Sequence, residues 1–249
     1  MSDEKNVLKK TTTNDIQLFN IKALLYGKPG TGKTHSASTL NPEKTLIISA
    51  EGGLLPLAGK KIDVVELGCW NDIKPIYFEL QNSETQKKYR NIFIDSLTEI
   101  NEMGKEQIVK RDRPAIKSDL GKVYDDLMTM QDWSLLQTRM TRLIRSFRDL
   151  PYNIIITCLE DLHKDEQTGI MAYTPSINGK LAVNVGGYFD EVFRMITKEI
   201  DGKIEYQFVT GKTERAIAKD RSGVLELHEA PNWSNIFKKI QKKFKGENK

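Results

Sequence analysis

The residues best suited to chemistry lie in one short stretch near the start of the chain. An apolar run ends at Gly27 and leads into G-K-P-G-T-G-K-T, which has the G-x-x-x-x-G-K-T spacing of a phosphate-binding loop. Glycines let the backbone curl so that consecutive N–H groups point into one concavity, at the positive end of the following helix. Lys33 is placed to reach the β- and γ-phosphates of a nucleoside triphosphate, and the Thr34 hydroxyl to bind Mg²⁺. We therefore predict a nucleotide site formed by Gly27, Lys28, Pro29, Gly30, Thr31, Gly32, Lys33, Thr34 and His35.

Two acidic residues follow apolar runs and are candidates for supporting the metal ion and activating water. Asp95 ends a run at 91–96, downstream of the phosphate loop, which is the arrangement of a Walker-B aspartate that supports Mg²⁺. Glu51 follows the run at 45–49, and the Gly-Gly pair after it lets the backbone open outward. Such a carboxylate can act as general base toward a water in line with the γ-phosphate. Two alternatives stay open: Asp95 only caps the next helix, and Glu51 is an ordinary turn carboxylate.

The composition is that of a globular protein with a polar surface. The chain has 249 residues, of which 39% are hydrophobic and 29% charged, and its formal net charge is +4. This length suits one α/β domain with insertions, or two small domains, and either can bury a full core. No stretch approaches the roughly 18 consecutive apolar residues of a membrane helix, and residues 1–15 are unlike a signal peptide, so we expect no membrane partner and a cytoplasmic protein. The two cysteines are expected to be reduced thiols without a catalytic role.

Apolar runs alternate with helical patterns along most of the chain. Strands are predicted at 16–26, 45–49, 62–67, 91–96 and 152–158, and helices at 33–40, 72–81, 97–110 and 132–149. This alternation predicts an α/β fold with a mostly parallel sheet, helices on both faces, and ligands at the carboxyl ends of the strands. In the last third, residues 160–180 are predicted to be loop-like with a hairpin near Gly169. Antiparallel strands are predicted at 190–197 and 203–210, and an amphipathic helix at 232–244.

Several of these segments together resemble a known family. Residues 46–53 (L-I-I-S-A-E-G-G) and 92–97 (I-F-I-D-S-L) are similar to the glutamate strand and the Walker-B strand of RecA-type recombinase cores. The order of segments from about 20 to 225, with further matches at 62–68, 178–181, 189–192 and 218–223, resembles phage-encoded AAA-type, RecA-like nucleotide-binding proteins. That group includes ATPases associated with single-strand annealing recombination. The resemblance implies a P-loop NTPase with a RecA-like core, which binds and hydrolyses ATP with Mg²⁺.

The resemblance also implies roles for particular residues. Glu51 would be the catalytic glutamate, acting with Lys33 and Asp95, and Thr157 would sense the γ-phosphate. Lys219 and Arg221 resemble the paired basic residues that a RecA-type subunit inserts into its neighbour's nucleotide site. Two cations at i and i+2 of an extended segment point the same way and can flank a developing charge. The alternative is an ordinary surface turn in which the intervening aspartate neutralises one of them.

On this interpretation the chain has an N-terminal flexible arm (1–15), a RecA-like ATPase domain (16–232), and a C-terminal amphipathic helix with a basic tail (233–249). It would self-associate, so that a neighbouring subunit completes the site, and act in phage DNA recombination or replication in a bacterial cytoplasm. Its partners would be single-stranded DNA and a recombination or single-strand-binding protein. Arg111, Arg113 and Lys117 are available for DNA, whereas residues 160–166 are acidic on balance, which opposes binding there. Two other classes stay open: a nucleotide-gated loader or scaffold with little turnover, and a small-molecule kinase.

Overall fold

The computed structural model of the protein describes residues 20–112, 117–118, 121–122, 128–164, 169, 171–213 and 215–244, the side chains of 111–112, 117–118 and 121–122 excepted. The predicted flexible arm, the first part of the strand predicted at 16–26, and the basic tail from 245 onward lie outside the described residues. So do the side chains of Arg111, Arg113 and Lys117, which were candidates for DNA contacts.

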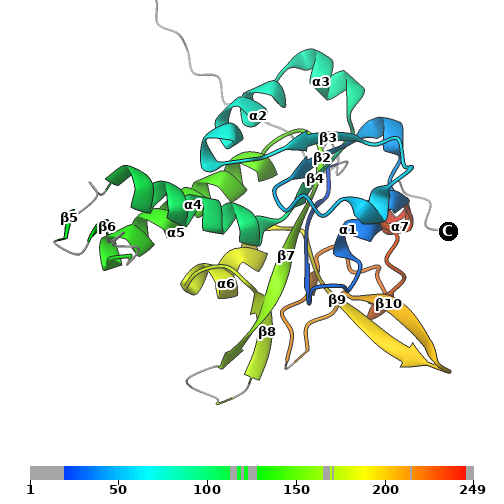
Figure 1. Ribbon diagram of the computed structural model, residues 1–249. Coiled ribbons are helices and arrows are strands. Elements are labelled where there is room, and N and C mark those ends of the chain that lie inside the picture. The colour runs from blue at the N-terminus through cyan, green and yellow to red at the C-terminus, as the bar shows by residue number, and fades with distance from the viewer. Residues whose placement is uncertain are drawn as a thin grey trace, which may run out of the picture.

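The centre of the sheet is parallel, as the sequence predicts (Figure 1). Its strands are β1 (Lys22–Gly27), β2 (Thr45–Ser49), β3 (Asp63–Glu66), β4 (Asn91–Asp95), β7 (Asn153–Lys164) and β9 (Glu191–Ile200). Each neighbouring pair in the order β3-β2-β4-β7-β1-β9 is parallel. Strand β7 therefore lies between the strand that leads into the phosphate loop and the strand that ends in Asp95. The carboxyl ends of these strands meet at one edge of the sheet.

Antiparallel strands extend this sheet in the last third of the chain. They are β8 (Met171–Pro175), β10 (Lys203–Val209), β11 (Lys219–Asp220) and β12 (His228–Glu229). The pair β9–β10 forms the predicted hairpin across Asp201-Gly202. The hairpin predicted near Gly169 is confirmed by the antiparallel pairing of β7 with β8, but the loop-like character predicted for 160–180 was wrong, because β7 continues to Lys164. A separate two-stranded ribbon joins β5 (Lys117–Ser118) and β6 (Gly121–Lys122).

Helices cover both faces of the sheet (Figure 1). One face carries α4 (Leu97–Asp112) and α5 (Met130–Arg148), and the other carries α1 (Lys33–Ser36) and α7 (Trp233–Phe244). Shorter elements complete the fold: α2 (Ile73–Glu79), α3 (Ser83–Lys88), α6 (Lys180–Asn184), η1 (Ala37–Thr39), η2 (Pro42–Lys44), η3 (Leu55–Leu57), η4 (Trp70–Asp72) and η5 (Val185–Tyr188).

Local capping explains where the helices differ from the prediction. Helix α5 begins two residues before the predicted start because Thr129 and Asp132 form a reciprocal capping box. Helix α3 was not predicted; it begins after Asn82, whose side chain accepts a hydrogen bond from the backbone N–H of Glu84. The helix predicted at 33–40 is α-helical only to Ser36 and continues as the 3-10 turn η1.

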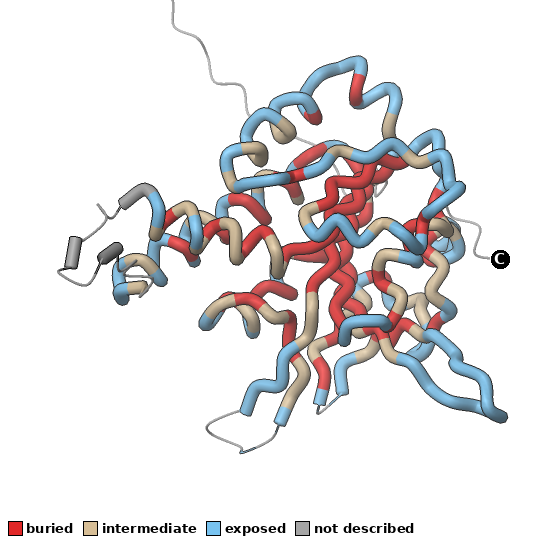
Figure 2. Tube along the Cα trace, in the orientation of Figure 1, coloured by how far each residue is buried: buried red, intermediate tan, exposed pale blue. Residues whose placement is uncertain are grey.

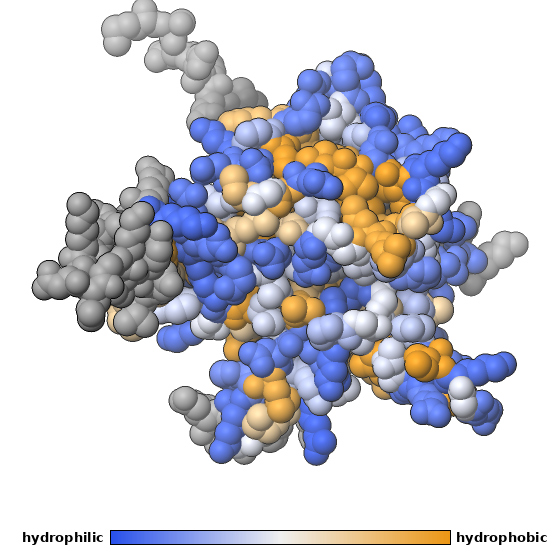
Figure 3. All heavy atoms as spheres, in the orientation of Figure 1, coloured by the Kyte–Doolittle hydropathy of each residue, from blue (hydrophilic) through white to orange (hydrophobic). Residues whose placement is uncertain are grey.

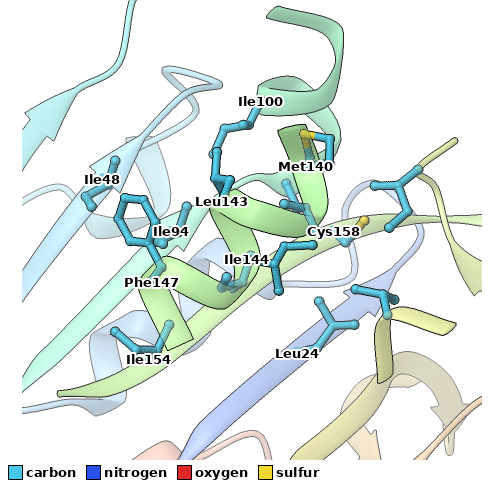
Figure 4. Close-up of a cluster of buried hydrophobic side chains, with 14 of the residues drawn as sticks. Leu24, Ile48, Ile94, Ile100, Met140, Leu143, Ile144, Phe147, Ile154 and Cys158 are labelled. Carbon is cyan, nitrogen blue, oxygen red and sulfur yellow. The ribbon is translucent and has the colours of Figure 1, made fainter. Parts of the chain in front are cut away.

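The core has two layers, one on each face of the sheet, and the strands run through the buried centre (Figure 2). Alternate residues of each strand point to opposite faces, so Ile94 and Ile154 belong to the layer under α4 and α5, and Phe93 to the other. In the first layer, Met140 and Phe147 of α5 pack toward the isoleucines of the sheet (Figure 4). Burial on both faces explains the near-continuous apolar runs of these strands.

The surface is mostly hydrophilic, and the largest group of apolar side chains lies in the upper part of the face drawn in Figure 3, with smaller groups elsewhere. Exposed apolar residues include Leu55 of η3 and Val64 of β3. Among the described residues, no helix is both long enough and apolar enough to cross a membrane. Both cysteines are free: Cys69 is exposed, and Cys158 is buried on β7, where burial raises the pKa of its thiol to about 12.

Candidate nucleotide-binding site

The predicted phosphate loop joins the carboxyl end of β1 to α1. Gly30 and Gly32 have φ values of 76° and 88°, in the left-handed region that favours glycine. A Cβ on Gly27 would lie 2.6 Å from the carbonyl oxygen of Met195 on β9, so the close approach of β9 requires glycine there. The backbone of the loop is therefore fixed by its glycines in a turn that carries the chain from the sheet edge into the first turn of α1.

Lys33 lies inside this loop, with only 8% of its surface exposed. Its Nζ donates to the carbonyl oxygens of Gly27 at 2.8 Å and Lys28 at 2.9 Å. Burial lowers the pKa of Lys33, while the negative charges of Asp95 and Glu51 oppose that shift. The structure thus places the ammonium group of Lys33 among the groups that the sequence predicts as its catalytic partners.

Asp95 connects two other predicted residues, Thr34 and Thr157. It is 2% exposed, at the end of β4, and its Oδ2 accepts a 2.7 Å hydrogen bond from the Thr34 hydroxyl. Its Oδ1 accepts a hydrogen bond from the hydroxyl of Thr157 on β7. Thr157 also pairs in register with Leu25 of β1, so the intervening strand brings it between the loop and Asp95. The structure therefore brings Thr34, Asp95 and Thr157 together.

This arrangement fits a hydrated Mg²⁺ ion bound with a triphosphate. Among the described residues, no group of three or more His, Cys, Asp or Glu side chains is arranged to hold a metal. Mg²⁺ does not need such a cage, because it keeps several waters and is usually held by one or two protein oxygens together with phosphate oxygens. The Thr34 hydroxyl and the Asp95 carboxylate, bonded to each other beside the loop, supply that donor set.

Glu51 lies across the same site. It is exposed, its backbone N–H donates to the carbonyl oxygen of Asp95 at 3.3 Å, and its Oε1 accepts a hydrogen bond from the Ser96 hydroxyl. Glu99 of α4 lies close by, where burial and the neighbouring charge of Glu51 raise the pKa of Glu99. The Ser96 hydroxyl thus links the end of β4 to Glu51.

Lys33, Thr34, Glu51 and Glu99 line one hollow of about 850 Å³, and Asp95 adjoins it through its hydrogen bond with Thr34. Its walls combine the predicted loop residues and Glu51 with Glu99, Leu159, Met195, Tyr206 and Pro231, which were not predicted. Nothing in the sequence marked Tyr206, because the residues around it only alternate between polar and apolar, as in any exposed strand, and form no nucleotide-binding motif. Only the pairing of β10 with β9, and of β9 with β1, brings its side chain beside the phosphate loop.

Helix α7 supports the helix of the phosphate loop from behind. The indole Nε1 of Trp233 donates to the Ser36 hydroxyl at 3.0 Å, and its backbone N–H donates to the Thr39 hydroxyl at 3.0 Å. The Trp233 ring also stacks on Phe193 of β9, with the ring centroids 5.6 Å apart. The loop is therefore held from the sheet on one side and from α7 on the other.

Lys219 and Arg221 do not join this site within one chain. Strand β11 pairs with the first residues of β9, at the amino ends of the parallel strands, whereas the phosphate loop follows the carboxyl end of β1. Lys219 Nζ donates to the carbonyl oxygens of Gly186, at 2.9 Å, and Phe189. Arg221 Nη1 donates to Asp190 Oδ1 at 2.6 Å. Their action in a neighbouring subunit's site stays a prediction.

The fold and the phosphate loop together define an α/β protein of the P-loop nucleotide-binding class. Residues 19–222 match the family model described as an AAA domain, which is most of the chain, and the protein belongs to this family. Membership indicates nucleotide binding of the NTPase type, typically with Mg²⁺. No curated protein matches the chain. Helix α7 lies beyond the matched residues.

Proposed function

We propose that this protein is a Mg²⁺-dependent ATPase with a RecA-like catalytic core. The observation that supports the proposal best is that the phosphate loop and Glu51 line one hollow, while the Asp95 carboxylate is hydrogen-bonded to Thr34 of that loop. A phosphate loop alone only binds nucleotide, whereas hydrolysis also needs a metal anchor and a group that orients the attacking water. Asp95 with Thr34 meets the first need, and Glu51 the second.

The chemistry assigns one step to each residue. Lys33 exchanges its contacts with the loop carbonyls for contacts with β- and γ-phosphate oxygens. Glu51 accepts a proton from the attacking water as the new bond to the γ-phosphorus forms and the bond to the bridging oxygen breaks, giving ADP and phosphate. When bound, Mg²⁺ neutralises charge on the phosphate oxygens. Thr157 holds Asp95 in place from β7.

The test compares Glu51→Gln with Glu66→Gln, an exposed glutamate at the end of β3 outside the hollow. Loss of a general base lowers turnover by about 10² to 10⁴-fold. We expect that loss in Glu51→Gln with MgATP binding retained, and wild-type turnover in Glu66→Gln. Turnover of Glu51→Gln within about threefold of wild type would refute the assignment. Wild-type protein that binds MgATP without hydrolysing it, with or without single-stranded DNA, would favour the alternative, a nucleotide-gated loader or scaffold.

The wider role is a second part of the proposal: an oligomer that acts on single-stranded DNA in phage recombination or replication. The sequence resemblance supports it. One structural fact also bears on it: Glu160, which begins the acidic run in the outer half of β7, forms a bidentate ion pair with Arg194 at 2.8 and 3.1 Å. Because Arg194 neutralises Glu160, this region repels a phosphate backbone less than its sequence suggests.

Binding of a labelled single strand at several salt concentrations, with and without MgATP, tests this role. We expect affinity that falls steeply with salt and changes with nucleotide. Absence of salt-dependent binding in both nucleotide states would remove DNA from the proposal and leave the ATPase activity standing.

A further inference from the structure

The hollow has two chemically different ends. Glu51 and Glu99 lie on the side of β2, β4 and α4, which we assign to the γ-phosphate. Met195 of β9 and Tyr206 of β10 lie on the other side of β1. A triphosphate bound along the loop with its γ-phosphate toward Glu51 therefore extends its nucleoside toward β9 and β10.

Tyr206 stands directly beside the loop. A Cβ placed on Gly32 would lie 3.4 Å from Cδ1 and 3.5 Å from Cε1 of the Tyr206 ring. The side chain is 43% exposed, although β10 is anchored along its length to β9. In the described part of the chain, its ring pairs with no other aromatic ring, unlike Phe208 two residues later, which packs against Phe193 and Trp233. Tyr206 thus offers a free aromatic face on a rigid strand.

The other groups at this end offer little that distinguishes one base from another. The Thr39 hydroxyl donates to the Ser36 carbonyl oxygen at 2.7 Å, and the Ser36 hydroxyl donates to the Lys33 carbonyl oxygen at 2.6 Å, so neither donor is free. Pro231 has no N–H, and the Met195 side chain is apolar apart from a weak acceptor. The exposed imidazole of His35 can donate or accept and therefore suits either purine.

We infer that the base of the nucleotide stacks on Tyr206 and that no side chain recognises its hydrogen-bonding edge. This inference rests on the proposed nucleotide site. Every base has a π-face, so stacking does not depend on which base is bound. A purine has the larger ring system and therefore gains more binding free energy from stacking than a pyrimidine. The protein is then a purine nucleotide binder that accepts ATP and GTP nearly equally and binds CTP less well. Tyr206 is the residue that contributes affinity for the nucleoside, whereas the loop contributes affinity for the phosphates.

The experiment measures the dissociation constants of MgATP, MgGTP, MgCTP and Mg-tripolyphosphate by isothermal calorimetry, for wild type, Tyr206→Ala and Tyr206→Phe. The matched control is Ile204→Ala, an exposed apolar residue on the same strand and face but outside the hollow. We expect Tyr206→Ala to weaken ATP and GTP alike, by about 5- to 100-fold, and to leave tripolyphosphate unchanged. Tyr206→Phe and Ile204→Ala should stay within about threefold of wild type, since each keeps the aromatic face.

Two results would overturn the inference: unchanged ATP affinity in Tyr206→Ala, or wild-type affinity for ATP more than about 30-fold above that for GTP, which only edge recognition gives. Both are distinct from failure of the proposed function. If ATP binds in a Tyr206-dependent way but is not hydrolysed, the base site stands and the ATPase proposal falls. If wild type binds neither ATP nor tripolyphosphate, both fall.

Discussion

Glu191 is the buried carboxyl group whose ionisation we expect to affect stability most. It is the first residue of β9, 2% exposed, and its Oε2 has no hydrogen-bond partner among the described residues. Burial, together with the nearby negative charge of Asp220, raises the pKa of Glu191 to about 9. Asp190 raises it further, while the backbone of Ser222 lowers it. Glu191→Gln removes the ionisable group and keeps the shape.

The expected size of the effect follows from proton linkage. The folded chain keeps a proton on Glu191 up to about pH 9, whereas the unfolded chain releases it near the ordinary glutamate pKa of 4.5. Between these pH values the unfolded state binds fewer protons, so the wild-type free energy of unfolding falls with rising pH, by about 1.4 kcal/mol per pH unit from this group. The free energy of unfolding of Glu191→Gln does not fall in this way. The difference in unfolding free energy between Glu191→Gln and wild type should therefore shift in favour of the variant by about 3 kcal/mol between pH 6 and pH 8.

Urea unfolding of wild type and Glu191→Gln from pH 5 to pH 9 measures this difference. Other titrating groups are common to both chains, so their contributions cancel in the difference. The exposed Glu205→Gln on β10 is the control, and its difference from wild type should stay flat with pH. A flat difference for Glu191→Gln as well would mean that Glu191 ionises normally in the folded state, and the reasoning from burial would be refuted.

Three further changes test hydrogen bonds and packing, two beside the site and one between α4 and α5. Thr157→Val removes the hydroxyl donor from Asp95 and should cost about 1.5–3 kcal/mol in urea unfolding, most of which Thr157→Ser should restore; equal stability of all three chains would contradict this. Trp233→Phe loses the bond to Ser36 and part of the buried ring system and should cost less than Trp233→Ala, which should cost about 3–5 kcal/mol; equal costs would show that a single ring does not restore the packing. Gly104→Ala places a Cβ 2.8 Å from a leucine methyl of α5 and should cost about 1–3 kcal/mol, despite the better helix propensity of alanine; a raised melting temperature would count against it.

The sequence was sufficient to predict the parallel sheet and the residues at the ends of its strands. Lys33, Thr34 and Asp95 could be found because the phosphate loop has fixed spacing and because a strand buried on both faces is a continuous apolar run. Thr157 was implied by the resemblance, and the structure places it at Asp95 because β7 is inserted between β1 and β4.

Other parts of the site depend on contacts between segments far apart in the sequence. Tyr206 lies beside the loop only because β10 pairs with β9 and β9 pairs with β1. The sequence of residues 203–209 does not indicate either pairing. The hairpin of β7 and β8 was predicted near Gly169, but its strands were predicted as loop-like because charged residues such as Glu160 resemble loop residues until their partners are known. Arg194, which neutralises Glu160, lies 34 residues away.

Strand β7 runs without a break from Asn153 in the centre of the sheet to Lys164 in the projecting hairpin. Thr157 lies in the buried half of β7, and the strand continues for seven more residues to Lys164. At 3.3 Å per residue, the distance along the strand from Thr157 to Lys164 is about 23 Å. One strand therefore joins the exposed hairpin to the buried hydroxyl of Thr157. A partner that binds the hairpin and displaces it would act on a continuous backbone that ends at the hydrogen bond between Thr157 and Asp95.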